Sequence, residues 1–209
     1  MADISIIEKY FPNLSDVQKS QFAALDALYQ DWNSKINVIS RKDMDNFYEH
    51  HVLHSLGIAK FTDFADGTEI LDLGTGGGFP AIPLAIIFPN VTFHAIDGVG
   101  KKIKVLNAVA ESIGLTNIKG EHLRAEDVKA KYDYVVSRAV MQMPDLMKLA
   151  RPLLKPVASS ALPVGVIALK GGDLTEELKP LGRNAMSESL TNYFEEDFFS
   201  TKSVVYVMK

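Results

Sequence analysis

Several features are missing from this chain, and each absence narrows its function. The 209 residues contain no cysteine, which excludes disulfides, thiolate metal sites and a cysteine nucleophile. No apolar run approaches the roughly 18 residues of a membrane-spanning helix, and no cationic segment precedes an apolar one near the N-terminus. We therefore expect a soluble, cytoplasmic protein.

An excess of positive charge is missing as well. The formal net charge is -4, so a surface that binds nucleic acid would have to be a local basic patch. Internal repeats and low-complexity segments are also missing. With 47% hydrophobic residues, the chain is long enough for one well-buried domain and short for two. We expect a single domain over residues 1–209 and a monomer.

The spacing of apolar residues predicts a helical N-terminal region followed by a region of alternating strands and helices. Ser15 and Gln18 have the spacing of a capping box before a helix that ends near Trp32, and a second helix is expected from about Lys42. After Thr68, strands are predicted near 69–73, 91–96, 117–121, 132–137 and 164–169, with helices near 80–88, 100–113 and 143–153. This alternation predicts a doubly wound, mostly parallel α/β sheet, with a helical cap at 1–64 on a core at 65–209. Two further β segments, 186–193 and 203–208, are expected to close the sheet as an antiparallel hairpin.

The segment TEILDLGTGGGFPAI, residues 68–82, carries the strongest local signal. A short apolar run ends in a glycine-rich loop, and a strongly apolar helix follows from Pro80. Such a loop lets the backbone approach a ligand closely, and the start of the helix offers free N–H groups to an anion. The segment therefore predicts a nucleotide-binding site.

Three nucleotide motifs compete for this loop. A phosphate-binding P-loop is excluded, because the Gly100-Lys101 pair is not followed by Ser or Thr. A dinucleotide fingerprint fits from Gly76 to Ala81, but it leaves Asp72 without a role. The pattern acid-x-Gly-x-Gly-x-Gly fits from Asp72 to Gly78 without a shift and is the first motif of S-adenosylmethionine-dependent methyltransferases.

Polar residues follow the other predicted strands, where ligands bind in open α/β sheets. Asp97 lies at the distance from the glycines expected of an acid that binds a ribose diol, in either a methyltransferase or a dehydrogenase. Glu126 could accept a hydrogen bond from adenine, or it could be an ordinary acid at a helix start. Arg138 offers a fork for a carboxylate or phosphate, and Lys170 could face a nucleic-acid backbone.

Three histidines, His50, His51 and His54, cluster in one predicted helix. His50 and His54 have the spacing of a zinc-binding pair, but no glutamate base and no third ligand accompany them. We therefore expect no metal, and interpret the cluster as part of a cleft or an RNA-facing surface.

With these residues in hand, the chain resembles the family of small-subunit rRNA guanine-N7 methyltransferases once called glucose-inhibited division protein B. The resemblance covers nearly the whole chain and rests on these motifs: NVISR at 37–41, HHVLHSL at 50–56, LDLGTGGGFP at 71–80, Asp97 with Lys101-Lys102, Ala125-Glu126, Ser137-Arg138-Ala139 and LKG at 169–171. It implies a Rossmann-like class I fold with a seven-stranded sheet and an antiparallel C-terminal strand. It also implies S-adenosylmethionine as cofactor and a guanine in the 530 loop of 16S rRNA as target, on the small subunit or an assembly intermediate of it.

The resemblance also implies a set of cofactor contacts. They are Gly74, Phe79, Ala125, Glu126 and Arg138, with Asp97 as the ribose acid and Gly76 and Gly78 in the same loop. From placement alone, the candidate RNA contacts are Lys35, Arg41, Lys42, His50 and Lys170. The chain departs from the family pattern at Ala81, Gly98 and His54, where glycine, serine and aspartate are usual.

Guanine N7 has a free lone pair, so its methylation needs no deprotonation and no general base. We therefore expect no catalytic side chain, and catalysis by alignment of the reacting groups. Two alternatives remain open: an NAD-dependent oxidoreductase, from the shifted fingerprint, and a non-catalytic RNA-binding protein that senses S-adenosylmethionine.

Overall fold

The computed structural model describes residues 3–157 and 162–209. Helices before the sheet are α1 (Ser5–Tyr10), α2 (Asp16–Lys35), the 3-10 helix η1 (Arg41–Asn46), the π-helix η2 (Phe47–Leu53) and α3 (His54–Phe61). The strands are β1 (Glu69–Leu73), β2 (Thr92–Asp97), β3 (Ile118–His122), β4 (Tyr134–Arg138), β5 (Gly165–Gly171), β6 (Ala185–Ser189) and β7 (Lys202–Met208). The helices among them are α4 (Ala81–Ile87), α5 (Gly100–Ser112), η3 (Ala125–Asp127), α6 (Met143–Ala150), η4 (Arg151–Leu153), α7 (Thr175–Leu178), η5 (Lys179–Asn184), η6 (Leu190–Asn192) and η7 (Asp197–Thr201).

In the part of the chain described, seven strands form one sheet in the order β3-β2-β1-β4-β5-β7-β6. The first five strands run parallel, and β7 is antiparallel to both β5 and β6. The order reverses between β1 and β4, which places the crevice for a ligand beyond the carboxyl ends of these two strands. This is the Rossmann-like class I topology, with the antiparallel closing strand that the sequence predicts.

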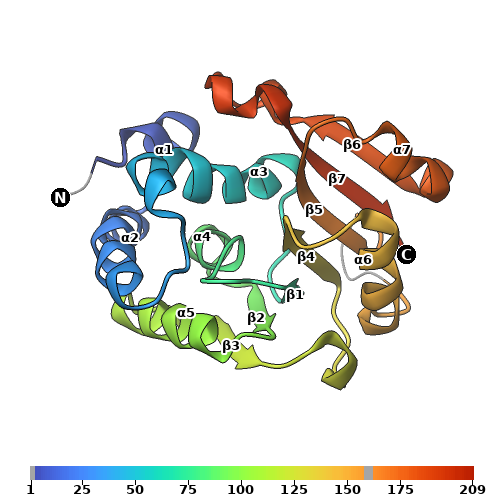
Figure 1. Ribbon diagram of the computed structural model, residues 1–209, viewed down its shortest axis with the longest axis horizontal. Coiled ribbons are helices and arrows are strands. Elements are labelled where there is room, and N and C mark those ends of the chain that lie inside the picture. Colours follow the sequence, from blue (N-terminus) through green and yellow to red (C-terminus); the bar gives the residue numbers. More distant parts are fainter. Residues whose placement is uncertain (1–2, 158–161) are drawn as a thin grey trace.

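Helices cover both faces of the sheet, as Figure 1 shows: α1 to α5 lie on one side, and α6 and α7 on the other. The side chains of β1 alternate between two apolar clusters, because successive residues of a strand point to opposite faces. Ile70 packs with residues of α2, α3, α4 and α5. Leu71 packs with residues of α6. The N-terminal helices thus share one core with the sheet.

The N-terminal helix α2 begins as its sequence predicts. Ser15 Oγ accepts from the N–H of Gln18, and Gln18 Oε1 accepts from the N–H of Ser15 at 2.9 Å, which is a complete capping box. The amide of Gln18 also donates to the carbonyl of Ile86 at 2.8 Å. The same residue therefore starts α2 and joins it to the last turn of α4.

One local prediction is confirmed with a difference and another is wrong. The helix expected from about Lys42 is present from Arg41 to Phe61, but it is a 3-10 helix and then a π-helix, and α-helical geometry begins only at His54. One carboxylate, Asp43, contacts both His50 and His51 in this region, which favours the wider turn. The β segment expected to reach residue 193 ends at Ser189, whose side chain accepts from the N–H of Thr191 and starts a 3-10 turn instead.

None of the helices in the described ranges is long and apolar enough to cross a membrane.

The junction between α4 and β2 depends on one amide side chain. Asn117 Nδ2 donates to the carbonyls of Ala85, Phe88 and Val91 at 3.0 to 3.1 Å. We expect Asn117→Ala to lower the free energy of unfolding by about 1–3 kcal/mol, because these carbonyls lose their donor. Urea unfolding would measure this, with the exposed Asn192→Ala as control. Equal stability of the two variants would contradict it.

Candidate functional site

The glycine loop between β1 and α4 is held against the end of β2. The N–H groups of Gly74 and Thr75 donate to the carbonyl of Ile96 at 2.9 and 3.0 Å. The N–H of Gly76 donates to Asp97 Oδ2 at 2.9 Å. This loop therefore turns at the edge of the sheet where the strand order reverses.

Neighbouring side chains leave no room for a Cβ at two glycines of this loop, whereas a third glycine borders open space. A Cβ on Gly74 would lie 2.6 Å from Val140 Cγ2, and one on Gly78 would lie 2.7 Å from Ile82 Cδ1. A Cβ on Gly76 would have no neighbouring atom within 4 Å. All three have positive φ, which favours glycine. The space beside the Gly76 backbone is thus open to an approaching ligand.

Asp72 ties the end of β1 to the start of α4. Its side chain is fully buried, and Oδ2 accepts from the N–H of Ala81 at 3.2 Å. Burial raises the pKa of this carboxyl to about 7, an effect that the Thr75 hydroxyl and the Ala81 N–H partly offset.

Asp97 lies at the end of β2 and faces the glycine loop. Besides the bond from Gly76, its Oδ1 accepts from the N–H of Val99 at 2.8 Å. The side chain is only half-buried, so its oxygens keep capacity for further hydrogen bonds. Ala125 is buried and Glu126 is exposed in the short helix η3, after β3. The ends of β1, β2, β3 and β4 thus carry all the cofactor contacts expected from the sequence.

Arg138, at the end of β4, is held by a chain of polar groups from the N-terminal region. Nη1 donates to the carbonyl of His50, and Nη2 lies 3.1 Å from Nδ1 of His51. His51 Nε2 lies 2.6 Å from Asp43 Oδ2. A guanidinium only donates, so His51 Nδ1 accepts and its Nε2–H donates to Asp43. The guanidinium also lies 5.1 Å from the centre of the Phe79 ring.

The electrostatics agree with this tautomer. Burial, with the charge of Arg138, lowers the pKa of His51 to about 4, so the ring is neutral at pH 7. Burial also lowers the pKa of Arg138 to about 10, which leaves it charged. The result is a fixed positive charge at the switch point, oriented by a neutral histidine.

The expected RNA contacts are distributed unevenly. Lys35 and Lys42 are exposed, although Lys35 pairs with Asp31 at 2.7 Å. Arg41 begins the 3-10 helix η1. His50 stacks on Phe198, with ring centres 3.9 Å apart, and contacts Asp43. These four lie in or near the N-terminal helices.

Lys170 does not fit the RNA-contact prediction. Its ammonium forms an ion pair with Glu177 at 2.6 Å, and each side chain is only 10% exposed. A cation committed to a buried carboxylate is not available to a phosphate. In this structure the Lys170 ammonium is thus engaged by Glu177, and its contact with RNA stays a prediction that this pairing does not favour.

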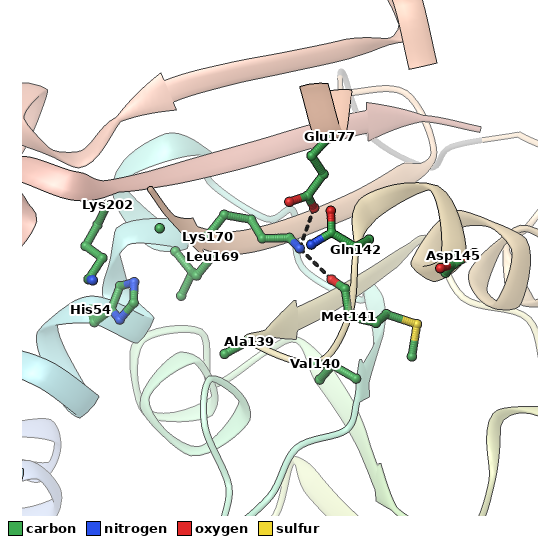
Figure 2. Close-up of a pocket in the computed structure, with 11 residues that line it drawn as sticks. His54, Ala139, Val140, Met141, Gln142, Asp145, Leu169, Lys170, Glu177 and Lys202 are labelled. Atoms are coloured by element: carbon green, nitrogen blue, oxygen red, sulfur yellow. Dashed lines mark hydrogen bonds and ion pairs between the residues drawn. The ribbon is translucent and has the colours of Figure 1, made fainter. Parts of the chain in front are cut away.

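Lys170 borders a cleft of about 650 Å³ beyond the ends of β4 and β5. Figure 2 shows residues of this cleft, which comprise His54, Ala139, Val140, Met141, Gln142, Asp145, Leu169, Lys170, Gly171, Glu177 and Lys202. It begins next to the glycine loop, since Val140 packs on Gly74. The cleft is large enough for a nucleobase.

Sequence reasoning missed three groups that shape the site. Tyr29, on α2, donates from its hydroxyl to the carbonyl of Gly77 at 2.7 Å. Asp43 and His51 orient Arg138, as described above. The HHVLHSL motif did single out His51, but only as part of a cluster, because nothing local indicates that it meets β4.

Comparison with known proteins places this site in a family. A methyltransferase of Aquifex aeolicus described as SAM-dependent has a similar fold, with a TM-score of 0.57 and 13% identity over 81% of this chain and 98% of that one. A protein of Phocaeicola vulgatus named ribosomal RNA small subunit methyltransferase G is 59% identical over 98% of both chains. A protein of the same name from Bacteroides thetaiotaomicron is 56% identical over 97% of this chain and 98% of its own. The family model described as GidB, rRNA small subunit methyltransferase G, matches residues 18–203.

The chain belongs to the GidB family. This confirms the resemblance seen in the sequence and decides against the dehydrogenase alternative. The methyl donor of the family is S-adenosylmethionine, and the described residues fit it: the space beside the Gly76 backbone is open, and Arg138 presents a charged guanidinium.

The three departures from the usual GidB pattern have identifiable surroundings. Ala81 is fully buried, and its N–H donates to Asp72. Gly98 is exposed, and its carbonyl lies 3.0 Å from His122 Nε2. His54 is buried at the cleft, its Nε2 has no partner among the described residues, and burial holds its pKa well below 6.5. A neutral ring thus replaces the usual carboxylate.

The raised pKa of Asp72 predicts how stability changes with pH. The folded protein keeps this carboxyl protonated up to about pH 7, whereas the unfolded chain releases the proton near 3.8. The protonated carboxyl therefore stabilises the fold at low pH, and this contribution is lost as the pH rises between these values. In Asp72→Asn the group stays neutral. We expect the variant to gain up to about 4 kcal/mol relative to the parent between about pH 4 and pH 8. Urea unfolding at each pH measures this; a constant difference would contradict it.

The role of His51 predicts a graded loss of cofactor affinity. His51→Leu removes the acceptor for Arg138 Nη2, and we expect S-adenosylhomocysteine to bind about 10- to 100-fold more weakly, the range for a lost charged hydrogen bond. His51→Asn keeps an acceptor near the Nδ1 position and should lose less. Titration calorimetry on variants with a normal unfolding midpoint tests this. Equal affinity of His51→Leu and the parent would show that Arg138 needs no such support.

Proposed function

We propose that this GidB protein transfers the methyl group of S-adenosylmethionine to N7 of a guanine in the 530 loop of 16S rRNA. The observation that carries the proposal is the match to the family over nearly the whole chain, joined to a glycine-loop site that opens onto a nucleobase-sized cleft. The setting we propose is the cytoplasm, with the small ribosomal subunit or an assembly intermediate as substrate. We treat residues 1–64 as a helical cap on the core at 65–209, within one domain.

The cofactor contacts follow from the strand ends. Gly74, Gly76 and Gly78 would bring the backbone close to the cofactor, and Asp97 would accept from its ribose hydroxyls. The additional contacts we propose are Phe79, Ala125, Glu126 and Arg138. The fork of Arg138 suits the carboxylate of the methionine part, since a guanidinium matches a carboxylate with two parallel bonds.

When bound, S-adenosylmethionine supplies a methyl group on a positively charged sulfur. Guanine N7 attacks with a lone pair that carries no proton, so no side chain has to act as a base. The residues of the cleft therefore have two tasks: they align the base with the donor, and they exclude water.

The charges in the cleft suit a base that becomes positive. The ammonium of Lys170 is neutralised by Glu177, and burial keeps His54 neutral. These two side chains thus add little repulsion to a methylated guanine, and Lys202 is a further cation that lines the cleft. Lys35, Arg41, Lys42 and His50, in or near the N-terminal helices, remain our candidates for RNA contacts.

Methyl transfer to small subunits that lack the modification tests the proposal. We expect label from S-adenosylmethionine to appear in 7-methylguanosine after nucleoside analysis. Asp97→Ala should reduce transfer by about tenfold or more at limiting cofactor, because the ribose loses its charged acceptor. Glu111→Ala, which removes an exposed acid on α5, is the matched control. Label in another nucleoside would refute the assigned atom, and tight cofactor binding without any label would favour the sensing alternative.

A further inference from the structure

The segment between β4 and α6 forms one wall of the cleft and needs support from outside itself. Residues 139–142 belong to no helix or strand. Ala139 has a φ of 54°, a left-handed conformation that residues with a Cβ adopt rarely. Val140 is 39% exposed and packs on Gly74 of the cofactor loop. The position of this segment therefore couples the cleft to the cofactor site.

That support comes from the ion pair between Lys170 and Glu177. Lys170 Nζ donates to the carbonyl of Met141 at 2.5 Å and lies 2.6 Å from Glu177 Oε1. The same Glu177 oxygen accepts from the N–H of Met143 at 2.7 Å. Figure 2 shows the ammonium between the carboxylate and the Met141 carbonyl. The pair thus fastens the segment to β5 and to α7.

Burial makes this arrangement specific. Both side chains are 10% exposed, so separating the two charges would leave each of them poorly hydrated and would destabilise the fold. The other ion pair near this end of α6, Lys148 with Asp145, has side chains 77% and 62% exposed. Such an exposed pair contributes little, whereas the buried pair determines where the backbone at Met141 and Met143 lies.

We infer that the Lys170–Glu177 pair is a positioning element for the methyl acceptor, which holds residues 139–142 between the cofactor loop and the cleft. The inference rests on the proposed function, because it assigns the cleft to the target guanine. Alignment limits the rate of a reaction that has no general base, so a displaced wall slows transfer more than it weakens cofactor binding.

Replacing the pair tests the inference. The double variant K170L/E177L leaves no unpaired buried charge, and Glu177→Gln keeps the shape of the side chain. We expect kcat to fall by about tenfold or more in both, with S-adenosylhomocysteine affinity within about threefold of the parent. Lys170→Arg, which keeps charge and donors, should recover part of the rate. Lys148→Leu and Glu176→Gln, which change exposed neighbours on α6 and α7, should behave as the parent.

A second readout does not depend on activity. The methyl groups of Met141 and Met143 report on the segment, and their carbon-13 NMR signals should shift in K170L/E177L but not in Lys148→Leu. A folded double variant with parental kcat, or with cofactor affinity reduced in parallel, would overturn the inference, as would unshifted methionine signals. Absence of guanine-N7 transfer by the parent protein would refute the proposed function instead, and the NMR result would still decide the positioning role.

Discussion

The site is organised around one charge that is largely withdrawn from water, the guanidinium of Arg138. Because it remains charged, its N–H groups need acceptors, and two of these acceptors come from a distant part of the sequence. The carbonyl of His50 and the ring of His51 provide them, while Phe79 packs against the guanidinium. The π-helix, the glycine loop and the end of β4 are thus fixed relative to one another by the need to satisfy a single cation.

The N-terminal helices are part of the site for a second reason. The hydroxyl of Tyr29 donates to the carbonyl of Gly77, and a Cβ on Gly77 would lie 3.0 Å from the Cβ of Val38. The cofactor loop is therefore packed from behind by α2 and by the segment that follows it. A loop rich in glycine is intrinsically mobile, and these contacts hold it in one conformation.

The ionisable groups share a common pattern: burial keeps several of them neutral, and others are paired. Burial favours the neutral forms of Asp72, His51 and His54, and Lys170 is matched by Glu177. A site whose histidines are held neutral and whose lysine is paired is well suited to alignment. This agrees with the chemistry of guanine N7, which offers its lone pair without losing a proton.

The amino-acid sequence alone was sufficient for the architecture and for the place of the glycine loop, next to Asp97 at the edge of the sheet. Alternating strand and helix patterns, the glycine motif and Asp97 depend on local backbone preferences and on a repeated spacing, and both can be seen in a single chain. The capping box at Ser15 was predictable for the same reason, because its two bonds join residues three apart.

Only the tertiary structure decided what each polar side chain meets. Lys170 was predicted to face RNA and instead pairs with Glu177, and His51 was one of a cluster and instead orients Arg138. The π-helix at Phe47–Leu53 also escaped prediction, since its contact with Asp43 depends on the chain path rather than on helical periodicity. His51 and Arg138 lie 87 residues apart in the sequence, and Lys170 and Glu177 come from different elements, β5 and α7. The strength of these contacts comes from burial, which no local pattern records.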